Sequence, residues 1–108
     1  TPSAGRCAAP LAAQLVGMSG AIVGQKYPLR LENVIGRGQM NDIPVNSGML
    51  SRKHTRILFI DDHYVLQDLG STNGSKINDV DVGTAPLADG DIVKLGDAVF
   101  RFEIISKR

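Results

Sequence analysis

Short apolar stretches separated by turn-forming residues run along nearly the whole chain, and this rhythm restricts the fold more than any other feature. Gly, Pro, Asn or Asp interrupts the apolar stretches about every eight to twelve residues, a spacing typical of antiparallel sandwiches and barrels. No segment keeps the apolar period of a helix, and glycines interrupt nearly every stretch that would be long enough to form one. The sequence therefore predicts an all-β fold.

The last apolar segment shows the alternation of a strand most clearly. Over residues 98–104, Phe100, Phe102 and Ile104 fall on one face, and the residues between them include an arginine and a glutamate. Because successive side chains of a strand point to opposite faces, this pattern predicts a half-buried strand.

A hairpin is predicted in the middle of the chain. Residues 55–60 and 64–67 are apolar and flank the compact connection Asp61-Asp62-His63, so the two segments should pair antiparallel. We interpret His63 as a turn residue of this hairpin. Earlier strands are expected over residues 15–18, 27–31 and 33–35.

Length and composition favour one folded domain. The chain has 108 residues, of which 43% are hydrophobic and 21% charged, close to globular averages. Residues 1–12 are mostly small and rich in Ala, Pro and Gly, and we expect them to form a flexible tail or linker. The domain itself is expected over residues 13–106.

Charge and cysteine content narrow the classes of function. The formal net charge is +1, which does not favour wholesale binding to nucleic acid or to a membrane surface. The apolar run near residues 8–16 is too short to span a membrane. One cysteine, Cys7, cannot form an internal disulfide, and no metal-ligand spacing is present. We expect no metal, no cofactor and a cytoplasmic or other intracellular location.

Three predicted loops hold the residues that could carry chemistry. Gly36-Arg37 follows one strand, Ser51-Arg52-Lys53-His54 precedes another, and residues 69–74 (LGSTNG) follow a third. Loops at one end of a sandwich converge in space, so these residues should form one site. Arginine supplies a fork of donors that matches phosphate oxygens, and hydroxyls add donors without charge. The loops therefore suit a phosphate ester.

Asn73 offers a different kind of recognition. Its side chain has both a donor and an acceptor, so it could bind a peptide main chain, which presents both groups as well. The dipeptide Asn73-Gly74 is also a strong turn signal, and the two interpretations are compatible because Gly74 would allow the turn that aims Asn73 outward.

Four motifs in order resemble the signature of the forkhead-associated (FHA) family. They are Gly36-Arg37, Ser51-Arg52-Lys53-His54, residues 68–74 (DLGSTNG) and residues 87–91 (LADGD), followed by Leu95-Gly96 and residues 100–102. The resemblance covers about residues 34–102. A single short motif of this kind is weak evidence, whereas four in order are specific.

The resemblance implies an FHA-type β-sandwich of two antiparallel sheets, with about eleven strands and with the binding loops at one end. It also implies a phosphothreonine-dependent protein interaction module for signalling, whose partner is a phosphorylated protein or peptide. By position in the motifs, Arg37 and Ser51 would contact the phosphate, Arg52 and Thr72 would assist, and Asn73 would hold the peptide backbone. Support of the site would come from Gly36, His54 and Gly74.

Other functions remain as alternatives. An enzyme would use Ser51 as nucleophile, His54 as base and Asp68 to orient it, but the pattern G-x-S-x-G is absent and we predict no catalysis. The domain could instead be a scaffold that binds protein without phosphate, or a regulatory domain of a larger multidomain enzyme. Residues Gly48-Met49 lie in the loop that in the family helps to select the third residue after the phosphothreonine, and the sequence leaves that preference open.

Overall fold

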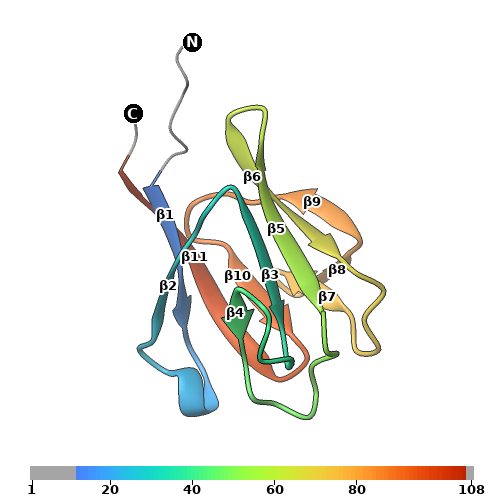
Figure 1. Ribbon diagram of the computed structural model, residues 1–108. Helices are drawn as coiled ribbons and strands as arrows, with labels where there is room; N and C mark the ends of the chain where they lie inside the picture. The colour runs from blue at the N-terminus through green and yellow to red at the C-terminus, as the bar shows by residue number, and fades with distance from the viewer. Residues whose placement is uncertain (1–11, 107–108) are drawn as a thin grey trace.

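Strands make up most of the regular structure in the computed structural model, which describes residues 12–106 (Figure 1). A short 3-10 helix, η1 (Gly20–Ile22), is the one helical segment in this range, and it is far too short to cross a membrane. The expected tail lies almost entirely outside the described residues, and the first strand begins at residue 12. The strands are β1 (Ala12–Gly17), β2 (Lys26–Pro28), β3 (Glu32–Gly36), β4 (Ile43–Pro44), β5 (Thr55–Ile60), β6 (His63–Asp68), β7 (Ser75–Ile77), β8 (Val80–Val82), β9 (Thr84–Pro86), β10 (Ile92–Leu95) and β11 (Ala98–Ser106).

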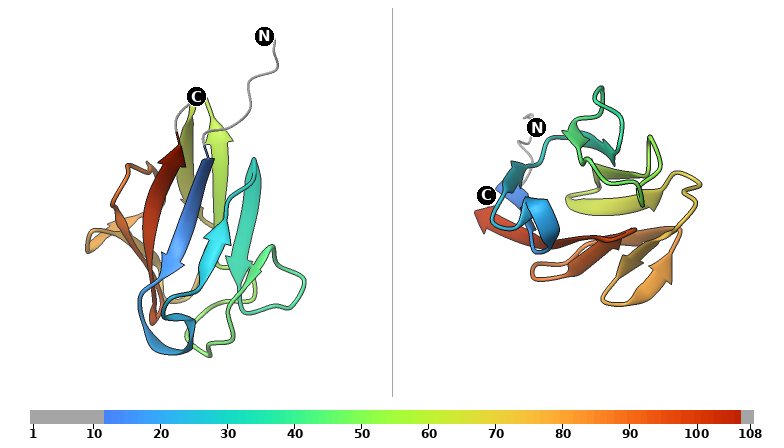
Figure 2. Two further views of the ribbon diagram at one scale, coloured as in Figure 1. Left: turned by 90° about the vertical axis from the view of Figure 1, so that its left-hand side faces the viewer. Right: turned by 90° about the horizontal axis from the view of Figure 1, so that it is seen from below.

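The eleven strands form two stacked sheets, as predicted. One sheet has the order β2-β1-β11-β10-β7-β8 and the other has the order β4-β3-β5-β6-β9. Figure 2 shows the two layers from the side and from below. The expectation of purely antiparallel sheets is wrong at one place, because β3 and β4 pair in parallel over two residues. The loop over residues 37–42 carries the chain back to the start of this short pair, so β4 runs in the same direction as β3.

Strand β11 supplies the centre of the core. Phe100 and Phe102 are fully buried, whereas Arg101 between them is exposed, which confirms the predicted alternation. The ring of Phe102 meets Tyr64 of the facing sheet edge-on, with 5.6 Å between ring centroids. Both sheets contribute apolar side chains to the same cluster, so burial between the layers holds the sandwich together.

The hairpin between β5 and β6 has the predicted antiparallel pairing, with a tighter turn than expected. Asp61 and Asp62 form a two-residue connection in which both have positive φ, 52° and 68°. Such turns match the twist of the flanking strands, and Asp tolerates this conformation better than most residues. His63 pairs with Ile60 as the first residue of β6, so its assignment to the turn was wrong.

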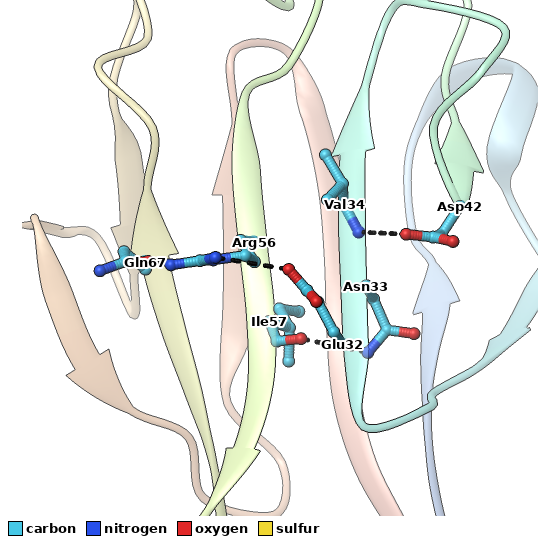
Figure 3. A network of polar contacts seen from close by, with 7 residues as sticks. All are labelled: Glu32, Asn33, Val34, Asp42, Arg56, Ile57 and Gln67. Atoms are coloured by element: carbon cyan, nitrogen blue, oxygen red, sulfur yellow. Dashed lines mark hydrogen bonds and ion pairs between the residues drawn. The ribbon is translucent and has the colours of Figure 1, made fainter.

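The expected strand over residues 27–31 is shorter in the structure and ends at Pro28. The cause is Asn33, a buried side chain whose amide accepts from the Arg30 N–H and donates to the Arg30 carbonyl, both at 2.9 Å. The same amide donates to the Ile57 carbonyl at 3.2 Å. Asn33 therefore turns the chain between β2 and β3 and ties the turn to β5 (Figure 3).

The outer face of the five-stranded sheet carries a cluster of polar contacts. Arg56 on β5 lies between Glu32 on β3, at 3.3 Å, and Gln67 on β6, whose side-chain Oε1 accepts a hydrogen bond from the Arg56 Nε at 3.0 Å (Figure 3). At the neighbouring edge, a carboxylate oxygen of Asp42 accepts from the Val34 N–H at 2.9 Å. This contact occupies a backbone donor that would otherwise be free at the sheet edge.

We predict that truncation of Phe102 to alanine lowers the free energy of unfolding by about 3–5 kcal/mol, because a large buried side chain leaves a cavity that the two sheets cannot close. Chemical denaturation would measure the change. The matched control is Ile105→Ala on the same strand, where the side chain is 58% exposed; there we expect a change within about 0.5 kcal/mol. Equal effects of the two substitutions would contradict the assignment of Phe102 to the core.

Candidate functional site

Three loops meet at the lower end of the sandwich because the strands that carry them are neighbours. Ile35 of β3 pairs with Thr55 of β5, and Thr55 pairs with Asp68 of β6, so the three positions lie in one row. The antiparallel order places the end of β3, the start of β5 and the end of β6 at the same edge. The loops that leave this edge lie together in Figure 1 and face the viewer in the right-hand view of Figure 2.

The loops enclose a small open pocket of about 200 Å³. Four of the five residues predicted to bind a phosphopeptide contribute to its walls, and Arg52 does not. No Asp or Glu is among the lining residues. The lining consists of Arg37, Gly48, Met49, Leu50, Ser51, Thr72 and Asn73.

Arg37 is held by its backbone and free at its side chain. Its N–H donates to the Ser51 carbonyl at 3.0 Å, which joins the first loop to the second. The guanidinium is exposed and forms no hydrogen bond or ion pair with any residue in the described range. Gly36 makes this approach possible, since a Cβ there would lie 2.2 Å from the Arg52 carbonyl oxygen. The predicted supporting role of Gly36 thus has a steric reason.

Ser51 joins the second loop to the third. Its Oγ accepts a hydrogen bond from the Thr72 N–H at 3.1 Å. A hydroxyl has one proton of its own, and in Ser51 this proton remains available to a ligand. The bond also places the Thr72 side chain, which is exposed, at the wall of the pocket.

Asn73 contributes to the pocket from the third loop. Its Nδ2 donates to the Met49 carbonyl at 2.6 Å, so the amide holds the second loop, while its Oδ1 accepts no hydrogen bond from the described residues. Gly74 follows with φ +80°, a conformation that favours glycine, and its N–H donates to the Ser71 Oγ at 2.9 Å. The turn and the outward position of Asn73 occur together, as the sequence suggested.

His54 is fully buried beneath the pocket and braces it. Its Nδ1 accepts from the Ser51 N–H at 3.2 Å, and its Nε2 lies 2.8 Å from the Gly74 carbonyl. Because a backbone N–H donates to Nδ1 and a carbonyl accepts from Nε2, the ring is neutral with its proton on Nε2. Its ring makes no hydrogen bond to the Ser51 hydroxyl, so the two side chains do not form the relay that a serine nucleophile needs.

Asp68 braces the third loop from inside. Its carboxylate accepts hydrogen bonds from the hydroxyls of Ser71 and Ser75, both at 2.6 Å, and from the N–H groups of Gly70 and Ser71, both at 3.0 Å. Burial acts to raise the pKa of Asp68, but these four hydrogen bonds outweigh burial and hold the pKa below its usual value. Asp68 makes no contact with His54 that could orient it as a base.

Arg52 lies outside the pocket, in a hollow on the β3–β4 side of the loop end. This neighbouring hollow has a volume of about 260 Å³ and is lined by Gly38, Gln39, Met40, Asn41, Arg52 and Lys53. Sequence reasoning missed Asn41, whose amide donates to the carbonyls of both Gly38 and Arg52. No motif marks Asn41, because its partners lie in two different loops.

Comparisons with known proteins give consistent matches. The family model for the FHA domain matches residues 33–96. The FHA domain-containing protein FhaA of Mycobacterium tuberculosis is 40% identical over 74 residues, which are 68% of this chain and 14% of FhaA. The chain thus spans about a seventh of that relative's length.

Solved structures agree with the same family. A structure from a structural and functional analysis of phosphothreonine-dependent FHA domain interactions superposes with a TM-score of 0.82 at 33% identity, covering 89% of this chain and 99% of the other. EmbR of Mycobacterium tuberculosis, in complex with a low-affinity phosphopeptide, superposes with a TM-score of 0.81 at 32% identity. That match covers 90% of this chain and 25% of EmbR.

We predict that Asp68→Asn flattens the dependence of stability on acid pH. A carboxylate with a lowered pKa stabilises the fold above its ordinary pKa of about 4, and this contribution is lost as the pH falls through the folded value. The variant should be less stable than the wild type by about 1–3 kcal/mol at pH 7, and the difference should shrink below about pH 4. Urea denaturation from pH 7 to pH 2.5 would measure it.

The matched control for Asp68 is Asp79→Asn, which removes an exposed carboxylate (82% exposed). Its denaturation midpoints should stay close to those of the wild type across the same pH range. A difference between Asp68→Asn and the wild type that stays constant with pH would contradict the bracing role of the ionised Asp68.

Proposed function

The chain belongs to the FHA domain family, and we propose that it binds phosphothreonine peptides in the pocket between Arg37, Ser51 and Asn73. FHA domains are interaction modules, and the similar structures include one described as phosphothreonine-dependent and one complexed with a phosphopeptide. We propose the same activity for this chain because of the geometry of its own loops.

The free guanidinium of Arg37 is the observation that carries the proposal. It stands in a pocket whose described walls hold no carboxylate, next to a serine hydroxyl with an unused proton. A phosphate dianion presents several strong acceptor oxygens, and charged hydrogen bonds to arginine are the strongest that a side chain can offer it. Arg37 and Ser51 would bind the phosphate, and the Thr72 hydroxyl at the pocket wall would assist.

Asn73 would hold the peptide main chain beside the phosphothreonine. Its Oδ1 is free to accept from a peptide N–H, while its Nδ2 is already anchored on Met49. An anchored amide loses less side-chain entropy on binding than a mobile one, which favours affinity. Arg52 lines the neighbouring hollow, so we do not place it on this phosphate.

A role without catalysis is part of the proposal. Ser51, His54 and Asp68 are each engaged in bracing the loops, through contacts that differ from those of a catalytic triad.

The chain corresponds to a small part of FhaA, so it would act as the recognition domain of a larger protein. A cytoplasmic location fits a module with a single cysteine and no need for disulfides.

We predict that Arg37→Ala weakens binding of a phosphothreonine peptide by at least about tenfold, since each charged hydrogen bond contributes about 1.5–3 kcal/mol. Fluorescence anisotropy with a labelled peptide would measure the affinity, and thermal unfolding should stay near the wild-type value. The control Arg101→Ala removes an exposed arginine from β11 and should leave affinity unchanged. Binding that survives both Arg37→Ala and phosphatase treatment would instead support a phosphate-independent scaffold.

We predict that affinity falls as the pH is lowered from 7 to 5. The phosphate loses its second charge near pH 6, and the monoanion offers Arg37 less charge. The same anisotropy titration at half-unit steps would record the profile, with circular dichroism to verify that the domain stays folded. A flat profile over this range would contradict recognition of the dianion.

A further inference from the structure

The hollow beside the Arg37 pocket lies where the backbone pairing between the first and second loops continues by one residue. The Arg37 N–H donates to the Ser51 carbonyl at 3.0 Å, and one residue further on the Gly38 N–H donates to the Arg52 carbonyl at 3.1 Å. The first pair lies at the phosphate pocket and the second at the neighbouring hollow. An extended peptide rises about 3.3 Å per residue, so a ligand in the pocket can reach the hollow within a few residues.

The hollow is built by specific contacts. The Asn41 amide donates to the Gly38 carbonyl at 2.8 Å and to the Arg52 carbonyl at 2.6 Å, which ties its two sides together. A Cβ on Gly38 would lie 3.0 Å from the Arg52 Cγ, so the absence of a side chain there leaves space for the stem of Arg52. The position of Arg52 is therefore set by Gly38 and Asn41.

The hollow is cationic and lacks a counter-ion. Arg52 and Lys53 are exposed, and neither forms an ion pair or side-chain hydrogen bond with any other residue of the described range. The ion pairs found within residues 12–106 involve other cations, on β5, β10 and β11. No Asp or Glu lines the hollow, and Met40, which is 97% exposed, gives it an apolar rim. It suits a side chain with an apolar stem and an anionic end.

The opposite side of the pocket has the opposite charge. A larger hollow of about 410 Å³ meets the pocket at Gly48, and its lining includes Asp97, to which the Ser47 hydroxyl donates at 2.5 Å. An anionic side chain would be repelled there and attracted at Arg52 and Lys53. A peptide that leaves the phosphate pocket in one direction therefore meets positive charge, and in the other direction it meets negative charge.

We propose that Arg52 and Lys53 form a second anion subsite, which binds an acidic or phosphorylated side chain of the same peptide. This inference rests on the proposed function. The preferred ligand is a phosphothreonine peptide with a second anionic residue a few positions away, on the side that points away from Asn73 and Asp97. A carboxylate and a second phosphate share the required chemistry, and the experiment separates them.

The test is a scan of a phosphothreonine peptide that carries no other charged side chain. One Glu is placed in turn at each of the four positions before and the four positions after the phosphothreonine, and affinities are measured by anisotropy. We expect a gain of about three- to tenfold at one or two adjacent positions on one side only, as for a partly exposed ion pair. A second phosphothreonine at the best position should give a larger gain, because its charge is higher.

The double variant Arg52→Gln/Lys53→Gln should abolish this gain and change the affinity for the Glu-free peptide much less. The double variant Lys26→Gln/Arg30→Gln is the matched control, since it removes the same charge from exposed positions of β2 and the following turn, and it should keep the gain. Raising the salt concentration should reduce the gain without removing binding of the Glu-free peptide.

The outcomes separate this inference from the proposed function. If the Glu-free phosphopeptide does not bind at all, the proposed function fails. If it binds through Arg37 but the Glu scan is flat, equal at all positions, or unaffected by the Arg52→Gln/Lys53→Gln variant, the second subsite is overturned and the first site stands. Equal binding of an unphosphorylated acidic peptide would also overturn it, because it would show general charge attraction.

Discussion

The hydrogen bonds of residue 54 hold the functional end of this domain together. The buried His54 ring joins the backbone of Ser51 to that of Gly74, at 3.2 Å and 2.8 Å. Its own backbone N–H donates to Ile35, and its carbonyl accepts from Leu69. One residue thus contacts the end of β3, the second loop and both ends of the third loop. Because the ring is shielded from water, no solvent competes for these bonds, which strengthens the link between the loops.

Around this brace, the loops satisfy their own backbone groups with short polar side chains. Asp68 accepts four hydrogen bonds within the third loop, and Asn41 ties the first loop to the second. The groups left over are those that face the pocket, above all the guanidinium of Arg37 and the hydroxyl proton of Ser51. Braced loops with unused outward donors are the preorganisation that the proposed binding of an anionic ligand requires.

Charge is distributed unevenly across this end of the molecule although the whole chain is nearly neutral. The cationic side chains of Arg37, Arg52 and Lys53 form no ion pair within the described structure, and Asp97 lies in the hollow on the other side of the pocket. The formal net charge of +1 is an average over the whole chain, so it does not show this local contrast between positive and negative sides. Local separation of charge is better suited to choose among phosphorylated peptides than a uniformly basic surface.

Local patterns were sufficient where the deciding contacts are local. Alternation identified β11, and apolar segments on both sides of a compact connection identified β5 and β6. The spacing of turn residues and the four motifs identified the sandwich class and the three loops. The short strands β4, β7, β8, β9 and β10 went unassigned, because segments of two to four residues are too short to show an alternation and are defined by their partners.

Residue types and their order along the chain were enough to predict that Arg37, Ser51, Thr72 and Asn73 lie together, and the structure brings these four into one pocket. Only the tertiary structure showed that Arg52 lines a different hollow from Arg37. It also showed that Asn41 ties two loops together and that Asp97 lies near the pocket. Their positions depend on contacts between residues 11 to 50 places apart in the chain, such as Asn41 with Arg52 and Ser47 with Asp97. Such contacts form when strands pair and loops converge, so no local pattern records them.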